Sequence, residues 1–327
     1  MKISSCYRNM LVFVLCTLCL CVGCSKRGGN NDSSEVEDNS HDFSKSVIEV
    51  SYDSNYSAIG GDGFLFSIEE ETKEAKLISY YDVELLEVTL PDAIRYEDTE
   101  YPVTSIGESA FESDQSIVKI QLGKNIRTIE NSAFYAAAAL NEVVFQDALT
   151  SIGERAFASC SVLKTISWGQ ALETVGNSAF EGDEELQTLQ LPKSVTGWGS
   201  EVFMDCTGLT ECTFEEGATT IGEGMFTNCT ALKTISIPDS VSAIGAGAFW
   251  SCLELKEISL PDTVTSIGDQ AFYSTGIQTL RLPAQLAVVK LELLEGMDSL
   301  SEISVPESKQ KDYENIFHNY GIQIKAY

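Results

Sequence analysis

Residues 232–252 read LKTISIPDSVSAIGAGAFWSC, and this stretch contains the pattern that decides the fold. Ile235 and Ile237 alternate with hydroxyl residues, which is the period-two pattern of a short strand with one buried face. Pro238 then marks a turn, and a second apolar segment with a Gly-rich bend leads to Phe249. One such unit is too short to bury its own apolar face. The pattern therefore indicates a unit that packs against copies of itself.

Copies of this unit extend in both directions along the chain. A phenylalanine recurs every 23 residues at Phe111, Phe134, Phe157, Phe180, Phe203, Phe226, Phe249 and Phe272. A second apolar column occupies Ile117, Leu140, Leu163, Leu186, Leu209, Leu232, Leu255, Ile277 and Leu300, with one residue missing after Phe272. We therefore expect an α/β-type repeat solenoid over residues 85–305, with 23-residue repeats, a parallel strand ladder and few or short helices.

A solenoid needs structures that cover its two ends. Residues 46–84 predict an N-terminal β-hairpin cap, with strands at 64–68 and 75–80 around the turn EEETKE. Residues 306–327 predict a C-terminal cap with a short amphipathic helix over 307–320. The side chains expected to face inward from this helix are Tyr313, Ile316, Phe317 and Tyr320.

The first 45 residues are different in composition. Residues 1–23 contain an apolar run, 11–22, that is too short to span a membrane and fits a secretory signal peptide. The ending Val-Gly-Cys resembles the lipobox of bacterial lipoproteins, with Cys21 where leucine is commonest, and the resemblance implies that Cys24 carries a lipid. Cleavage nearby by ordinary signal peptidase is the alternative. Residues 24–45 are polar and predict a flexible tether.

Charge and histidine content exclude several classes of function. The chain has 49 Asp and Glu against 21 Lys and Arg, a formal net charge of -28, which disfavours nucleic acid as a partner. Its two histidines, His41 and His318, lie near the ends of the mature chain. The middle of the chain therefore has no histidine for a Ser-His-Asp site or for a zinc site with imidazole ligands. We expect no catalytic residues, no metal site and no cofactor.

Four cysteines share one column of the repeat: Cys160, Cys206, Cys229 and Cys252. The preferred interpretation is a column of small buried residues with inert thiols. A single disulfide, between Cys206 and Cys229 or between Cys229 and Cys252, remains open because the protein is expected to be exported.

Two groups of acidic residues have the composition of possible sites. Asp183, Glu184 and Glu185 interrupt the cysteine column, and a solvated turn is favoured over a calcium site because no spaced ligand set is present. Glu211 and Glu257 stand on one exposed column, as a glycosidase pair would require. Their open polar surroundings offer nothing to raise the pKa of one partner, so we do not expect an enzyme.

The exposed positions of the strands form the candidate binding surface. We call it the strand face and define it by Thr165, Ser167, Thr188, Gln190, Glu211, Thr213, Thr234 and Ser236. Short hydroxyl side chains and carboxylates dominate these columns, which contain no aromatic anchor. The alternative is that they are only β-favouring polar residues on a solvated surface.

The repeat unit of residues 232–252 resembles the BspA-type leucine-rich repeat of bacterial surface proteins, and YPVTSIGESAF at 101–111 is similar to the first repeat of that family. The resemblance covers residues 85–305. It implies a role at the bacterial surface, in adhesion to host matrix proteins or other cell-surface proteins. Together with the lipobox, it leads us to expect an exported protein that is lipid-anchored to the bacterial outer membrane at the cell surface. The membrane would be contacted only through the lipid on Cys24.

Two other functions remain open at this point. One is a periplasmic or surface scaffold without a host partner, and the other is an accessory protein of polysaccharide handling. A repeat scaffold is shared by proteins with different partners, so the sequence leaves the partner, and the choice between a periplasmic and an outward-facing location, undecided.

Overall fold

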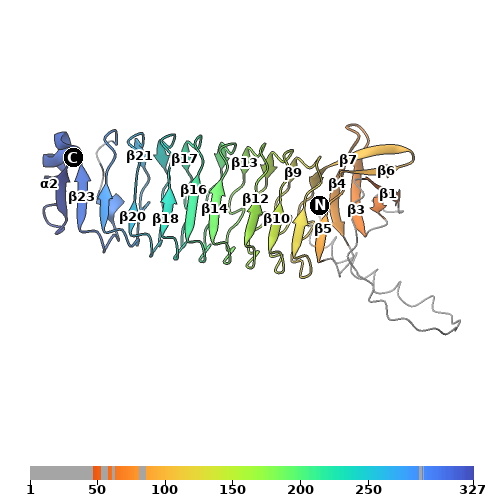
Figure 1. Cartoon of the computed structure of the whole chain (residues 1–327), viewed down its shortest axis with the longest axis horizontal. Helices are drawn as coiled ribbons and strands as arrows, with labels where there is room; N and C mark the ends of the chain where they lie inside the picture. Colours follow the sequence, from red (N-terminus) through yellow and green to blue (C-terminus); the bar gives the residue numbers. More distant parts are fainter. Residues whose placement is uncertain (1–46, 53–57, 61–62, 81–85, 287–288, 290) are drawn as a thin grey trace, which may run out of the picture. The chain divides into compact units, whose positions relative to one another are not determined.

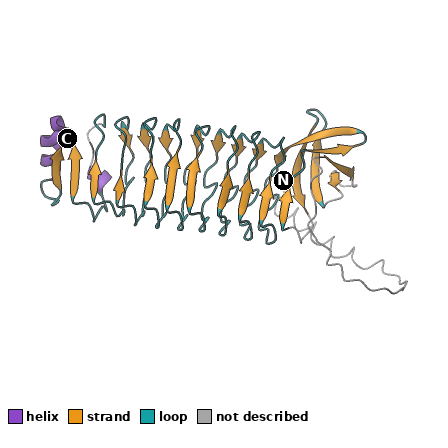
Figure 2. Ribbon diagram, viewed as in Figure 1, coloured by secondary structure: helices purple, strands orange, loops and turns teal. Residues whose placement is uncertain are grey.

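The computed structural model describes residues 47–52, 58–60, 63–80, 86–286, 289 and 291–327, and every structural statement below refers to these residues. The predicted signal peptide, the tether and Cys24 lie outside them. Within the described part, successive coils of the chain stack side by side, and all but the last ones contribute two short strands (Figures 1 and 2).

The first strand of each coil belongs to a parallel series that we call the face ladder. Its members are β5 (Glu87–Thr89), β8 (Lys119–Gln121), β10 (Glu142–Val144), β12 (Thr165–Ser167), β14 (Thr188–Leu191), β16 (Glu211–Phe214), β18 (Thr234–Ser236), β20 (Glu257–Ile258), β22 (Thr279–Arg281), β23 (Glu302–Val305) and β24 (Gln323–Ala326). Equivalent residues pair across coils, as Glu142 does with Thr165, so the register follows the sequence repeat. Period-two alternation puts every second side chain into the core.

The second strand of each coil belongs to the back ladder. It begins at β7 (Thr99–Ile106) and continues through β9 (Thr128–Ile129), β11 (Ser151–Ile152), β13 (Thr174–Val175), β15 (Gly197–Trp198), β17 (Thr220–Ile221), β19 (Ala243–Ile244) and β21 (Ser266–Ile267). The pairs from β7 to β15 and from β17 to β21 are all parallel, and the ladder is interrupted between β15 and β17. The parallel solenoid predicted from the repeat is confirmed.

The repeated phenylalanines stack as one column through the core. Neighbouring rings from Phe111 to Phe272 lie 4.8 to 5.8 Å apart, centroid to centroid, with interplanar angles of at most 16°. Each of these side chains is at most 1% exposed. The stack begins one ring earlier than the repeat suggests, because Tyr80 packs on Phe111 at 5.1 Å.

The turn that carries each phenylalanine contains two residues with left-handed backbone, such as Ser109 and Ser113 around Phe111. This conformation is costly for most residues, and small or polar residues and glycine occupy it in every coil. The turns are held together by main-chain hydrogen bonds between coils, for example from Phe111 N–H to the Ala133 carbonyl at 2.7 Å. Repetition therefore satisfies main-chain groups that a single turn would leave unpaired.

The N-terminal end is covered by a small antiparallel sheet. Its strands are β1 (Val47–Tyr52), β2 (Ala58–Gly60), β3 (Phe64–Glu69) and β4 (Glu74–Tyr80), joined by β6 (Ala93–Tyr96). The β3–β4 pair confirms the predicted hairpin. β4 also pairs in parallel with β7, which makes the cap continuous with the back ladder.

The C-terminal end combines the short 3₁₀ segments η2 (Leu291–Leu294) and η3 (Glu307–Lys309) with one helix, α2 (Gln310–Phe317). The predicted helical cap is confirmed, and Tyr313 and Phe317 are buried. The inward position predicted for Tyr320 is wrong: the helix ends at Phe317 and Tyr320 is 58% exposed. A final strand, β24, was not expected and pairs in parallel with β23.

Candidate binding surface: the strand face and its interruption

The strand face is an exposed, regular array of polar side chains. Thr188, Glu211 and Thr234 are directly opposite one another on β14, β16 and β18, and Gln190, Thr213 and Ser236 form the adjacent column. All eight residues of the face are exposed except Thr213, which is half-buried. Their main chain is fixed by ladder pairing, so the face presents its hydrogen-bonding groups in a fixed spacing.

The face ladder is interrupted between β12 and β14. On one side of the gap, Thr165 N–H donates to the Asn141 carbonyl at 3.2 Å, and on the other, Thr210 N–H donates to the Gln187 carbonyl at 2.8 Å. Within the described part of the chain no main-chain hydrogen bond joins β12 to β14. The single ladder expected from the sequence is therefore divided, and Thr165 and Ser167 lie on a different segment from the other six residues. A second interruption separates β18 from β20.

The same coils stay joined on their opposite side. β13 and β15 pair through Thr174 with Gly197, and the Phe180 N–H donates to the Val202 carbonyl at 2.9 Å. The main-chain pairing between these two coils is therefore interrupted only along the face ladder, and a cleft opens there.

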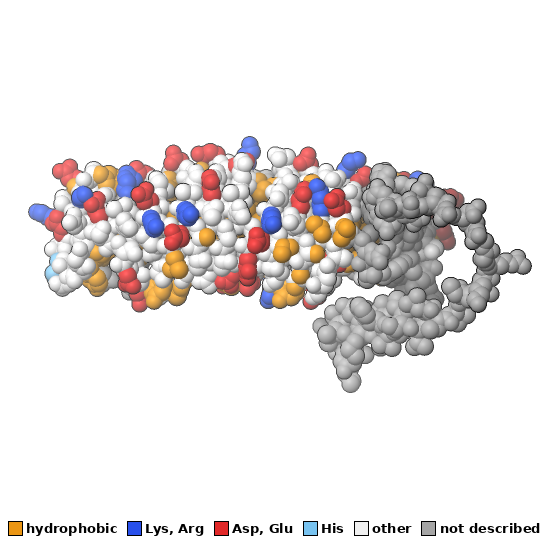
Figure 3. Space-filling model, turned by 60° about the horizontal axis from the view of Figure 1, so that its bottom comes forward, with side chains coloured by type: hydrophobic (Ala, Val, Ile, Leu, Met, Phe, Trp, Pro, Cys, Tyr) orange, Lys and Arg blue, Asp and Glu red, His pale blue; other side chains and the backbone are white. Residues whose placement is uncertain are grey.

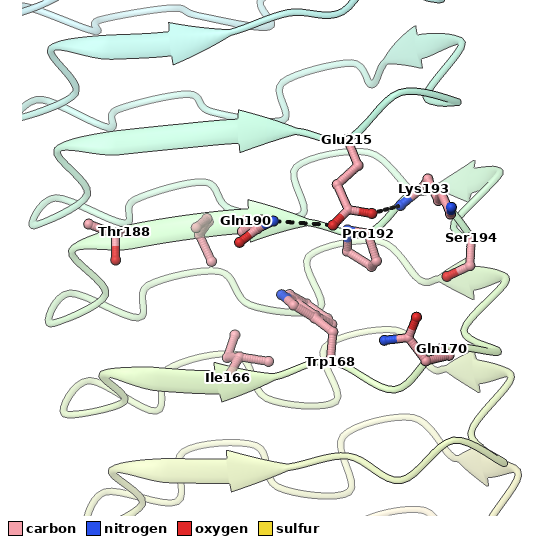
Figure 4. Close-up of a pocket in the computed structure, with 10 residues that line it drawn as sticks. Ile166, Trp168, Gln170, Thr188, Gln190, Pro192, Lys193, Ser194 and Glu215 are labelled. Carbon is pink, nitrogen blue, oxygen red and sulfur yellow. Dashed lines mark hydrogen bonds between the residues drawn. The ribbon is translucent and has the colours of Figure 1, made fainter.

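Trp168 stands in this opening, at the end of β12 (Figure 4). Its counterparts in the neighbouring coils, Phe145 and Leu191, are buried, whereas Trp168 and Ile166 are half-buried. The indole ring packs against Phe145 and Phe180, with both ring centroids 5.7 Å away. Trp168 was not among the predicted site residues because it occupies a core column of the repeat. Its side chain is larger than those of its column neighbours, and this size was the only feature of the sequence that could have indicated a local change in packing.

The cleft beside Trp168 has a volume of about 320 Å³ and a largely polar rim. Gln190 Nε2 donates to Glu215 Oε1 at 3.2 Å, and the main-chain N–H of Lys193 donates to Glu215 Oε2 at 3.3 Å. Gln170 and Ser194 complete the rim, and the Ser194 Oγ is buried without a hydrogen-bond partner in the described structure. Two donors thus hold the Glu215 carboxylate in place at the mouth of the cleft.

Acidic side chains are spread along the visible surface of the repeats, with apolar side chains in small patches (Figure 3). On the early strands, the Lys119 ammonium lies 2.8 Å from the Glu142 carboxylate, and this hydrogen bond raises the pKa of Lys119. Both side chains are half-buried at the surface, where such pairs contribute little stability. Glu211 and Glu257 are both exposed and stand on different ladder segments, β16 and β20, so the structure does not bring them together in a pocket.

The column of cysteines is fully buried. The Cys160, Cys206, Cys229 and Cys252 thiols each donate to the carbonyl of a phenylalanine in the preceding coil at 3.2 Å. All five described cysteines, including Cys212 on β16, are free. Burial raises the pKa of each of these thiols, which disfavours the reactive thiolate.

Asp183 corrects one expectation. The solvated turn predicted for residues 183–185 holds for Glu184 and Glu185, which are exposed, but Asp183 is 0% exposed. Its side chain points into the cysteine column because it occupies the cysteine position of its coil. Burial raises the pKa of Asp183 well above the usual range of an aspartate.

The described residues contain no cluster of three or more His, Cys, Asp or Glu side chains that could bind a metal ion. Among the helices of the described part, none has the length and apolar character needed to cross a membrane.

Three solved structures illustrate the similarity of the fold. A leucine-rich repeat protein from Bacteroides ovatus is 22% identical with a TM-score of 0.67, over 81% of this chain and 76% of that one. A leucine rich repeat protein of T. pallidum is 19% identical with a TM-score of 0.54, over 82% and 98%. A leucine rich cell surface protein from Faecalibacterium prausnitzii is 23% identical with a TM-score of 0.53, over 78% and 72%.

No curated protein matches the chain. The sequence model described as BspA type Leucine rich repeat region (6 copies) matches residues 79–210 and 198–323, which together cover most of the chain. These residues include the phenylalanine stack, the back ladder, the face ladder as far as β23, and the strand face. The chain therefore belongs to the BspA-type leucine-rich repeat family.

Proposed function

We propose that this protein is a lipid-anchored, exported protein of the bacterial surface that acts by binding other proteins and not by catalysis. The observation that carries the proposal is the strand face on β14, β16 and β18, where six polar residues stand in register and five of them are exposed. Repeat solenoids commonly bind partners through such extended surfaces. The family is one of repeat scaffolds, and a similar solved structure is described as a cell surface protein.

The partner we propose is a protein with a basic patch, on host matrix or on another cell. The chain carries a formal net charge of -28, so a basic surface is attracted over a distance and its association rate falls as salt rises. The strand face contains no aromatic side chain, so contacts there are individually weak. Many copies on one membrane then supply the avidity.

The test is a pull-down with the intact protein against host matrix proteins, bacterial surface polymers and envelope proteins. The partner found is then measured against the triple variant Thr188→Lys, Glu211→Lys, Thr234→Lys. A matched control places the same charge change on the opposite side, with Thr220→Lys, Glu223→Lys and Ser266→Lys. We expect binding to fall at least tenfold for the first variant only. Equal binding by both variants removes the strand face from the proposal.

The anchor is proposed at Cys24, in a segment outside the described residues. Cys24→Ala removes the thiol that would be acylated, so the variant is expected to leave the detergent phase in a phase-partition experiment. A variant that still partitions into detergent at the mature size places the anchor elsewhere. Cleavage of the wild-type protein on intact cells by added protease distinguishes a surface protein from a periplasmic scaffold.

A further inference from the structure

The cleft between β12 and β14 has features that the protein-binding proposal does not use. It combines a half-buried indole with a rim of amide, hydroxyl and carboxylate groups from Gln170, Gln190, Ser194 and Glu215. Its volume of about 320 Å³ lies at the lower end of the range for small-molecule sites.

The cleft is preformed by the packing of its two walls. On the β12 side, the chain after Trp168 lies directly on the preceding coil: a Cβ added at Gly169 would come within 2.3 Å of the Gln146 carbonyl oxygen. The indole is held from behind by Phe145 and Phe180. On the β14 side, the pairing with β16 is complete. Neither wall therefore needs to be reorganised when a ligand enters.

The ladder break by itself does not make such a site. At the second interruption, Ile235 and Ile237 take the positions that Ile166 and Trp168 have at the first, and they are also half-buried. Of the two breaks in the described part of the face ladder, only the first has an aromatic ring in its half-buried apolar wall. The difference points to the ring as the recognition element.

We infer that this cleft binds one pyranose unit of a glycan. The C–H groups on one face of a pyranose carry partial positive charge, which complements the negative face of the indole of Trp168. The sugar hydroxyls would then meet Gln170, Gln190 and the Glu215 carboxylate, which is held as an acceptor by its two donors. This site goes beyond the proposed protein binding and does not depend on it.

The charges around the cleft make a phosphate-bearing ligand unsuitable. Glu215 stands at its mouth, and among the described residues that line it Lys193 has the only cationic side chain. The Lys193 ammonium forms no ion pair in the described structure, so it is free to meet the carboxylate of a uronic acid. Neutral and acidic sugars both offer a pyranose ring to the indole. The experiment below distinguishes which of the two classes binds.

Calorimetric titration of the full-length chain tests the inference, in a detergent without a sugar headgroup. The probes are neutral cello- and xylo-oligosaccharides and acidic oligogalacturonides. We expect saturable binding of at least one probe with a Kd of about 1 mM, as befits one small subsite. Trp168→Ala should weaken it at least tenfold, and Trp250→Ala, which removes an indole stacked on Tyr273 instead, should leave it unchanged.

Because Trp168 also packs on the core, its replacement could unfold the protein, so the thermal stability of each variant is measured beside the titration. Two further variants replace exposed side chains outside the core. Gln170→Ala should weaken every glycan that binds about threefold. Lys193→Ala should weaken only the oligogalacturonides, if those bind. Absence of binding by all probes up to about 10 mM overturns the inference, as does binding by Trp168→Ala equal to that of the wild type. If no glycan binds but Trp168→Ala loses the protein partner found by pull-down, the cleft belongs to the protein-binding surface instead.

Discussion

The carboxyl group of Asp183 and the thiol of Cys206 occupy equivalent positions in successive coils, and both residues are 0% exposed. The Cys206 thiol donates to the Phe180 carbonyl at 3.2 Å, whereas neither carboxyl oxygen of Asp183 has a hydrogen-bond partner in the described structure. Burial, and then the nearby Asp183, raise the pKa of the Cys206 thiol. The column contains a second acid, Asp114, but its carboxylate accepts main-chain hydrogen bonds from Ser116 and Ile117, so Asp183 is the buried acid without a partner.

Asp183→Asn is expected to stabilise the protein increasingly as pH rises. Burial raises the pKa of Asp183 in the folded state, whereas in the unfolded chain the pKa is near 4. At a pH between these two pKa values, the Asp183 carboxyl is protonated in the folded chain and ionised in the unfolded chain. The free energy of unfolding of the wild type then falls as pH rises, by up to about 1.4 kcal/mol per pH unit from this group. Urea melts of both proteins at pH 4, 5, 6 and 7 measure the difference.

Glu184→Gln is the matched control, because it removes the same charge from the exposed surface of the same turn. Its effect should stay within about 0.5 kcal/mol at every pH. Asp183→Cys should also stabilise at pH 7, since a thiol there can donate to the Phe157 carbonyl as Cys206 does to Phe180. A pH-independent difference between Asp183→Asn and the wild type would show that the buried acid is not protonated.

Phe226→Ala should lower the free energy of unfolding by about 3 to 5 kcal/mol. Its ring lies between Phe203 at 5.8 Å and Phe249 at 5.7 Å, so truncation leaves a cavity inside the stack. The control is Leu253→Ala, an apolar residue that is 51% exposed and should cost less than about 0.5 kcal/mol. Equal losses in urea melts would argue against the stack as a main source of stability.

The buried thiols should resist alkylation in the folded protein. Burial raises the pKa of Cys160, Cys206, Cys212, Cys229 and Cys252, so little thiolate is present at pH 8. Peptide mass mapping after iodoacetamide treatment should find these five cysteines unmodified when folded and modified in urea. A peptide pair joined through Cys206 and Cys229, or through Cys229 and Cys252, would instead establish a disulfide.

Removal of residues 323–327 should cause self-association. β24 covers the edge of β23, and the Tyr327 hydroxyl donates to the Leu282 carbonyl at 2.7 Å beneath the Arg281 guanidinium. Without β24, the edge of β23 presents unpaired main-chain groups to other molecules. Light scattering should show dimers or larger species, whereas Tyr327→Phe should remain monomeric and lose only about 1 kcal/mol. A monomeric truncated protein would mean that α2 alone protects the edge.

The sequence by itself determined the repeat, the direction of the strands and the identity of the core columns. A spacing of 23 residues allows only one register when every phenylalanine stacks on the next, so Phe111 to Phe272 and the alternation along each strand were enough. The same logic located the hairpin and the C-terminal helix. The repeat did not predict β24 or the exposure of Tyr320. The residue at which the C-terminal helix ends depends on tertiary contacts of the segment that follows it, and these contacts are not encoded in the repeat.

Only the tertiary structure decided where the repeats depart from one another. Trp168 and Asp183 occupy columns whose other members are mostly buried, and the repeat period predicts the same surroundings for every member of a column. Whether successive coils stay paired along the face ladder depends on the volumes of the core side chains that pack behind the strands. These side chains come from several coils, so the sequence of one repeat does not determine the pairing. The cleft at Trp168 and the buried acid at Asp183 therefore arise from packing between coils, while the strand face follows directly from the alternation of polar and apolar residues.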